Sequence, residues 1–186
     1  MDQRRLVERA REGDHDAFAE LVRAAVVRLD RAARLILHDP ELARDAVQEA
    51  LLRAWRDLPG LRDPERFDAW LHRLVVNACI DQARRRRRRP IEVELAPLHE
   101  PLIADGSGSL ADRDQVDSAL RRLDERGRAI VVLHYYLGMP LTEVAATLSL
   151  PVGTVKSRLH HALEAMRFAI VAEPITAPAS REGRPA

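Results

Sequence analysis

The chain has 186 residues, of which 46% are hydrophobic and 32% charged, and its formal net charge is +1, which is ordinary for a globular protein of one domain or two small ones. Its single cysteine, Cys79, excludes an intramolecular disulfide, and no cluster of Cys and His has the spacing of a zinc site. Because no apolar stretch is long enough to span a bilayer and the charged N-terminus is unlike a signal peptide, we expect a cytoplasmic protein without membrane insertion.

Helical periodicity dominates the first half of the chain. Strand signals are nearly absent and aromatic residues make up only 4% of the sequence, so we predict an all-α protein. Helices are predicted over about residues 2–11, 15–37, 40–57 and 66–87. Asp39 before Pro40 favours a helix start, because aspartate accepts free N–H groups and proline suits the first helical position. The segment "IEVEL" is the one alternating stretch.

The helix predicted over 40–57 has a broad apolar face and an opposite face with Leu52 at its centre. The polar residues around this leucine are Asp45, Gln48, Glu49 and Arg56. A single exposed leucine is normal in a globular protein. An apolar centre with a polar rim is also typical of a protein-binding surface. The residues alone leave both interpretations open.

The helix predicted over 66–87 leads into six consecutive arginines, Arg84 to Arg89. Its expected buried side consists of Phe67, Trp70, Leu71, Leu74, Val75 and Ala78. His72, Arg73 and Val76 are expected to point away, with Asn77 at the edge of the buried stripe. A run of like charge is most often a solvated tail, or it can be a localisation signal. On a DNA-binding protein it would contact phosphates.

Charge is segregated along the chain. Residues 90 to 118 hold seven acidic and one basic side chain, whereas residues 119 to 172 hold seven basic and four acidic ones. The acidic segment also contains Pro and Gly, which is typical of a linker. We therefore predict two small helical domains, over 5–89 and 115–170, joined by a flexible acidic linker over 90–114 and followed by a disordered tail over 171–186.

The stretch "LTEVAATLSLPVGTVKSRLHHAL" contains two helical patterns separated by a tight corner, which is typical of a helix-turn-helix whose second helix enters the DNA major groove. Thr154 can help close the N-terminus of that helix. Its outward face is expected to carry Ser157, His160, His161 and Glu164, with Lys156 and Arg158 on the flanks. A plain helical hairpin in an all-α core is the alternative. The single acid among these basic and polar groups favours DNA.

Three stretches carry a family resemblance: "ELARDAVQEALLRAW", "FDAWLHRLVVNACIDQARRRRRR" and the stretch quoted above. In this order they resemble the bacterial sigma factors of the extracytoplasmic-function (ECF) type, in the sigma-70 family, over nearly all of residues 5–170. The resemblance implies a DNA-binding protein, without catalytic activity or cofactor, that binds core RNA polymerase and directs promoter-specific transcription initiation. It also implies an anti-sigma factor as a partner.

The resemblance assigns roles to three groups of residues. The first stretch would dock on the clamp helices of the beta-prime subunit of core polymerase, through Asp45, Gln48, Glu49, Leu52 and Arg56. The minus-ten promoter strand would be captured by Arg62, Asp63, Phe67, Trp70, Arg73, Asn77, Arg84 and Arg85, although core packing explains Phe67 and Trp70 equally well. The minus-thirty-five element would be read by Thr154, Lys156, Ser157, Arg158, His160 and His161. From the helical wheel, Arg158 is favoured for a two-pronged contact to guanine and Lys156 for the backbone, although the flank position of Arg158 would also allow a phosphate contact.

The chain departs from the family pattern at several positions. His161 stands where many members have arginine, and Val76 where many have a basic residue. Val22 and Ala25 stand where tyrosines are common, which affects packing.

Two other functions would require features that the sequence lacks. A stand-alone helix-turn-helix regulator that binds duplex DNA as a dimer would need a ligand pocket or βα alternation. An enzyme acting on nucleic acid would need a carboxylate or metal-ligand cluster. The sequence shows neither pattern.

Overall fold

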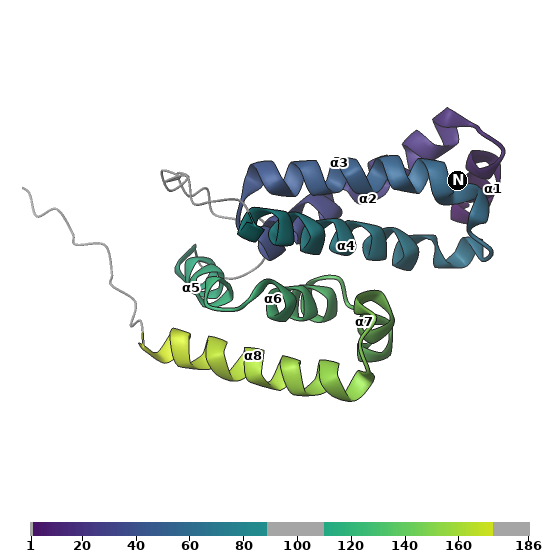
Figure 1. The fold of residues 1–186 in the computed structure, drawn as a ribbon. Helices are drawn as coiled ribbons and strands as arrows, with labels where there is room; N and C mark the ends of the chain where they lie inside the picture. The colour runs from purple at the N-terminus through teal and green to yellow at the C-terminus, as the bar shows by residue number, and fades with distance from the viewer. Residues whose placement is uncertain (1, 89–109, 173–186) are drawn as a thin grey trace, which may run out of the picture.

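The computed structural model describes residues 2–88 and 110–172 (Figure 1). These residues form eight α-helices and no β-strand, so the predicted all-α class is confirmed. Arg89, the segment "IEVEL", the predicted linker up to residue 109 and the tail from residue 173 lie outside the described residues. No helix in the described parts of the chain combines the length and the apolar character needed to cross a membrane.

The four helices of the first domain begin and end within one residue of the predicted positions. They are α1 (Gln3–Arg11), α2 (His15–Leu37), α3 (Pro40–Asp57) and α4 (Phe67–Arg88), with two short 3-10 turns, η1 (Leu58–Gly60) and η2 (Pro64–Arg66), before α4. The Asp14 carboxylate accepts the Ala17 N–H at 3.0 Å at the start of α2. The Asp39 carboxylate accepts the N–H groups of Glu41 and Leu42, each at 3.0 Å. These caps fix both helix starts, as the sequence predicts for Asp39.

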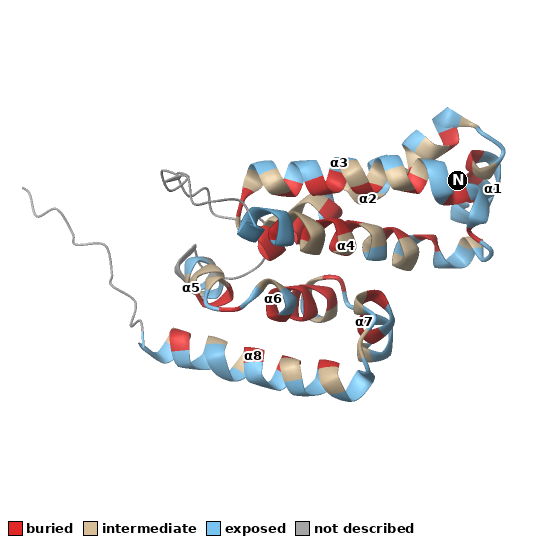
Figure 2. Cartoon of the chain, in the orientation of Figure 1, coloured by how far each residue is buried: buried red, intermediate tan, exposed pale blue. Residues whose placement is uncertain are grey.

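Helices α2, α3 and α4 pack side by side, and α1 lies across one end of the bundle (Figure 1). The inward face of α3 carries four alanines that are fully buried, Ala43, Ala46, Ala50 and Ala54. Small side chains let neighbouring helices approach closely. The buried sides of the helices face one another, and the outer sides are exposed (Figure 2). Because the alanine face of α3 packs in the core, the larger side chains of this helix face outward.

The second domain contains α5 (Leu110–Arg121), α6 (Glu125–Val131), a π-helical turn η3 (Val132–Tyr136), α7 (Leu141–Leu148) and α8 (Val152–Ala172). Helix α5 begins at Leu110, before the domain start predicted at residue 115. The corner between α7 and α8 places Ser149 in the left-handed region, with φ of 54°. The Leu150 N–H donates to the Ala145 carbonyl at 3.0 Å, which closes the end of α7. Two helices joined by a tight corner are thus present where the helix-turn-helix is predicted.

The two domains pack against each other, and their buried residues form one continuous core. Arg128 on α6 is buried, and its guanidinium donates to the carbonyls of Ile36, at 2.6 Å, and Leu123, at 2.9 Å. Arg28 on α2 donates in the opposite direction, to the carbonyl of Leu137 at 2.9 Å. The bonds to Ile36 and Leu137 satisfy backbone acceptors at helix ends with side chains from the other domain, whereas the bond to Leu123 lies within the second domain.

His38 lies at the same seam, at the C-terminal end of α2, with its imidazole buried beside α5. Burial and, after it, the nearby positive charge of Arg128 lower the pKa of His38 to about 4, although the Asp117 carboxylate acts in the opposite direction. The Asp117 carboxylate is 3.6 Å from the imidazole Nδ1. At neutral pH the imidazole is therefore uncharged, and this contact is not an ion pair.

Val76 is the clearest departure from the predicted burial pattern, because it is only 1% exposed instead of pointing away from the protein. Helix α4 packs against α6 and α7 as well as against α2 and α3. The expectation was wrong because it treated α4 as the outer helix of an isolated domain. Docking of the second domain covers a further side of α4, so an apolar side chain at position 76 is buried there.

Candidate functional site

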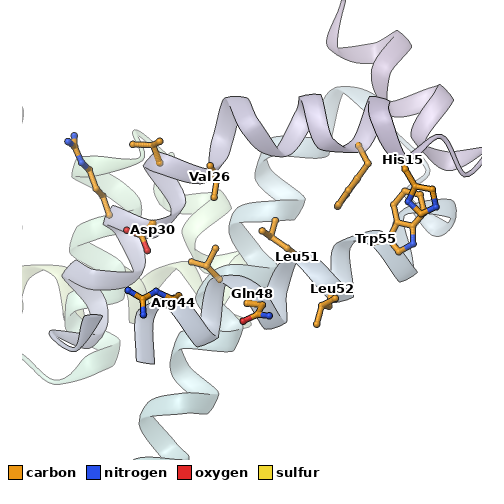
Figure 3. A pocket seen from close by; sticks show the side chains of 12 residues that line it. His15, Val26, Asp30, Arg44, Gln48, Leu51, Leu52 and Trp55 are labelled. Carbon is orange, nitrogen blue, oxygen red and sulfur yellow. The ribbon is translucent and has the colours of Figure 1, made fainter. Parts of the chain in front are cut away.

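A groove with a volume of about 770 Å³ runs between α2 and α3 on the outer side of the first domain (Figure 3). From α3 it is lined by the predicted residues Gln48 and Leu52, and from α2 by Val26 and Val27. The full lining is His15, Phe18, Val26, Val27, Asp30, Arg31, Arg44, Val47, Gln48, Leu51, Leu52 and Trp55. Leu52 is 67% exposed and Val27 64% exposed. Two large apolar side chains are therefore exposed to solvent in the same groove. Exposed apolar residues without a function are usually scattered singly over a protein surface.

Aromatic rings close one end of the groove (Figure 3). The imidazole of His15 stacks on the indole of Trp55, with ring centroids 4.3 Å apart and planes inclined by 25°. Phe18 meets the same indole edge-on at 5.1 Å. Such ring pairs hold one another in fixed positions, so this end of the groove is a rigid apolar wall. Asp30 and Arg44 provide polar groups toward the other end.

The predicted polymerase-binding residues do not all gather at this groove. Asp45 is exposed on α3 but does not line it. Glu49 forms ion pairs with Arg53 and, at 3.5 Å, with Arg85 on α4. Arg56 is exposed and pairs with Asp57 at 2.8 Å, and this contact lowers the pKa of the Asp57 carboxyl. Of the five residues predicted to bind polymerase, only Gln48 and Leu52 line the groove.

Sequence reasoning missed the contribution of α2, chiefly Val27 and His15, the latter stacked on Trp55 of α3. The only sequence signal was an apolar residue, Val27, outside the buried stripe of a long helix. An isolated residue of this kind carries no information until the neighbouring helix is known. The groove exists because α2 and α3 pack side by side.

The residues predicted for the minus-ten strand lie along the loop before α4 and on α4 itself. Arg62 and Arg73 are exposed, whereas Trp70 and Asn77 are half-buried. The Asp63 carboxylate accepts the Glu65 N–H at 3.1 Å, so its structural role is to cap the η2 turn. Asp63 also lies 3.4 Å from the Arg66 guanidinium, which further orders this loop.

Phe67 requires a correction. The structure buries it to 1% exposure, with its ring 6.0 Å from that of Trp70. It therefore has no free ring face for a base, and the core-packing interpretation holds for this residue. Trp70, which keeps part of its ring exposed, is the remaining candidate for a stacking platform on α4.

The arginine run continues α4 as a helix to Arg88 and is exposed along its length in the described residues. Its guanidinium groups face acids on several elements. Arg84 lies 3.6 Å from Asp81, Arg86 lies 3.4 Å from Asp39, and Arg87 pairs with Glu125 of the second domain. The arginine side chains of these pairs are exposed, whereas the carboxylates of Asp39 and Glu125 are only 13% and 23% exposed. The arginine run therefore presents positive charge to solvent even where it is paired.

On α8 the outward face agrees with the predicted helical wheel for most residues. Lys156, Ser157, His160 and His161 are exposed, and both imidazoles lie within 3.6 Å of the Glu164 carboxylate. Thr154 lies inside the first turn, because the helix begins at Val152, so the expected capping role was wrong. Its carbonyl accepts the Ser157 hydroxyl at 3.0 Å.

Arg158 differs from the other candidate DNA contacts on α8. It is half-buried and lines a cavity of about 270 Å³ together with Arg84 and Arg87 of α4. Ile80 and Ala83 of α4 line the same cavity, so Arg158 lies beside the first domain. Reading a base in the major groove therefore requires the side chain to leave this cavity.

Burial also affects the titration of two other side chains on α4, Cys79 and His72. Cys79 is fully buried, and burial raises the pKa of its thiol to about 12, which leaves it an unreactive thiol. Burial also lowers the pKa of His72. Among the described residues, no three His, Cys, Asp or Glu side chains are placed to hold a metal ion.

Comparison with known proteins supports an assignment to one family. Residues 21–89 match the model of Sigma-70 region 2, and residues 113–166 match Sigma-70, region 4. The chain is 39% identical to the ECF RNA polymerase sigma factor SigM of Mycobacterium tuberculosis, over 78% of this chain and 73% of that protein. It is 35% identical to the RNA polymerase sigma-E factor of Streptomyces coelicolor, over 90% and 94% of the respective chains.

A solved structure of CnrH, in complex with the cytosolic domain of CnrY, has the same fold, with 30% identity and a TM-score of 0.68 over 92% of this chain and 99% of that one. The sigma factor RpoE of Bartonella quintana, solved with the anti-sigma factor NepR, is 23% identical and has the same TM-score, over 84% and 98% of the two chains. The chain therefore belongs to the extracytoplasmic-function sigma factors of the sigma-70 family, the subunits that bind core RNA polymerase and direct transcription to specific promoters.

Proposed function

We propose that the groove between α2 and α3 is the surface of this chain that docks on core RNA polymerase, with the clamp helices of the beta-prime subunit as the element received. The observation that supports this most is the exposure of Val27 and Leu52 on two different helices that line one groove. A partner helix would bury both side chains, and Gln48 in the same groove would supply a polar contact.

We propose that residues 5–89 bind polymerase and capture the minus-ten strand, and that residues 115–170 read the minus-thirty-five element. The predicted linker, 90–114, and tail, 171–186, each overlap a described helix, because α5 begins at Leu110 and α8 ends at Ala172. The exposed Arg62 and Arg73 and the partly exposed Trp70 support strand capture. The outward His160 and His161 of α8 support groove reading. The protein would act in the cytoplasm, without catalysis.

We further propose that an anti-sigma factor binds this chain. The solved relative CnrH is bound to the cytosolic domain of CnrY, so a chain of this fold can hold a second protein. The open apolar groove between α2 and α3 offers such a partner the same exposed side chains that polymerase would bury. A factor bound there would exclude polymerase by direct competition.

Transcription in vitro tests the proposed function. Purified core polymerase is supplied with fragmented genomic DNA, with and without this protein, and the start sites are mapped. New start sites that depend on the protein are expected. A stand-alone regulator would instead bind duplex DNA as a dimer without core polymerase and would add no start sites to those of core alone.

A further inference from the structure

A cavity of about 270 Å³ opens at the seam between the domains, where α6 lies between α4 and α8 (Figure 1). Four arginines from three helices line it: Arg84 and Arg87 from α4, Arg126 from α6 and Arg158 from α8. The cavity exists only while the two domains are docked, because each domain contributes part of its lining.

The two carboxylates of this cavity are already engaged. Asp124 caps α6, and its carboxylate accepts the Gly127 N–H at 2.7 Å. Glu125 is paired with Arg87. Three guanidinium groups, those of Arg84, Arg126 and Arg158, are therefore left without either acid.

Within the described residues, Arg126 and Arg158 have no carboxylate within ion-pair distance, and Arg84 has only Asp81 of its own helix, at 3.6 Å. A neighbouring cavity of about 320 Å³ shares Arg84 and Arg126 and adds Arg53. Like charges held close together repel one another, and a bound anion removes that repulsion. The seam cavity is therefore lined by more arginines than carboxylates, so its net charge is positive.

We propose that this seam cavity binds a small anion that carries two or more phosphate groups, such as a free diphosphate or the phosphates of a nucleotide. Arginine suits this ligand because its planar fork donates two hydrogen bonds to neighbouring phosphate oxygens. Two linked phosphates offer more acceptor oxygens and span a longer distance than one carboxylate, so they can engage several guanidinium groups from both domains at once. Arg84, Arg126 and Arg158 are the three ligand-binding side chains.

Binding across the seam favours the docked arrangement of the domains, because the anion is held fully only when both domains contribute. Two of the three side chains, Arg84 and Arg158, are also proposed promoter contacts. On the basis of that proposed function, the anion and promoter DNA compete for the protein. The anion site itself does not depend on the assignment of promoter contacts.

The test uses the full chain and sodium pyrophosphate at constant ionic strength, with binding followed by titration calorimetry. We expect one site in the wild type and an affinity at least about tenfold lower in Arg126→Gln, since one charged hydrogen-bonding group is removed. Arg126→Lys should recover part of the affinity, because it keeps the charge but not the fork. Arg5→Gln, on the exposed surface of α1, removes the same charge far from the seam and should bind as the wild type does.

Guanosine diphosphate and guanosine, titrated in parallel, distinguish a nucleotide site from a bare diphosphate site, and guanosine alone should not bind. A second readout is thermal unfolding, in which pyrophosphate should raise the Tm of the wild type and of Arg5→Gln but not that of Arg126→Gln. Equal binding by Arg126→Gln and Arg5→Gln would overturn the proposal, as would the absence of pyrophosphate binding to the wild type. Transcription in vitro is a separate test of the proposed function. The anion proposal can therefore fail while the proposed function holds.

Discussion

Replacing Leu52 by aspartate is the most direct test of the groove between α2 and α3. The side chain is 67% exposed in the free chain, so the substitution should change the free energy of unfolding by no more than about 0.5 kcal/mol. In the complex with polymerase, the variant lacks the apolar contacts of the leucine and must bury a carboxylate. Both changes weaken binding. Together they should weaken binding to core polymerase by about 3 kcal/mol, or roughly 100-fold in affinity.

The assay is competition between labelled wild type and unlabelled variant for purified core polymerase, followed by fluorescence anisotropy. Val27→Asp, in the same groove but on α2, should lose affinity to a similar extent. Val171→Asp is the matched control, because this valine is 82% exposed on α8, away from the groove. If Leu52→Asp competes within threefold of the wild type while its thermal unfolding is unchanged, the groove is not the docking surface.

Three further outcomes are expected. Replacing Arg85 and Arg87 by glutamine should weaken promoter binding by the holoenzyme alike on all sequences and lower the log-log salt slope by about 0.9 for each phosphate that is no longer neutralised; an unchanged slope would mean that neither side chain meets DNA. Selection of randomised minus-thirty-five elements should give a relaxed preference for Arg158→Ala and a shifted one for His161→Arg, and identical selected sequences would exclude base reading by α8. The pKa of His38 is lowered to about 4 in the folded chain, so the unfolded chain binds the proton first and stability should fall by about 1–2 kcal/mol between pH 7 and pH 5. His38→Leu should flatten this dependence in denaturant titrations, and a dependence equal to that of the wild type would assign it to other groups.

The local features of this fold could be predicted from the sequence because their causes are local. Asp39 and Pro40 define the start of α3 whatever surrounds them. The exposure of Leu52 and of His160 and His161 follows from helical periodicity and the position of the apolar stripe.

The features that could not be predicted depend on contacts between distant parts of the chain. Val76 is buried and Arg158 lines a cavity beside α4 because the second domain docks on α4, and no local pattern predicts that docking. The carboxylate partners of the arginine run come from α3, its N-cap and α6. The groove itself requires the pairing of α2 with α3, which placed Val27 beside Leu52.

The bonds from Arg128 to the Ile36 carbonyl and from Arg28 to the Leu137 carbonyl mean that each domain satisfies a helix-end acceptor of the other. An isolated first domain would leave the Ile36 carbonyl to water, and the last turn of α2 would fray. In hydrogen exchange, amides of this turn should then be protected in the full chain and exchange rapidly in a fragment ending at residue 88. The last turn of α2 therefore becomes ordered when the domains dock. A partner that separates the domains must either unfold this turn or supply another donor to the Ile36 carbonyl.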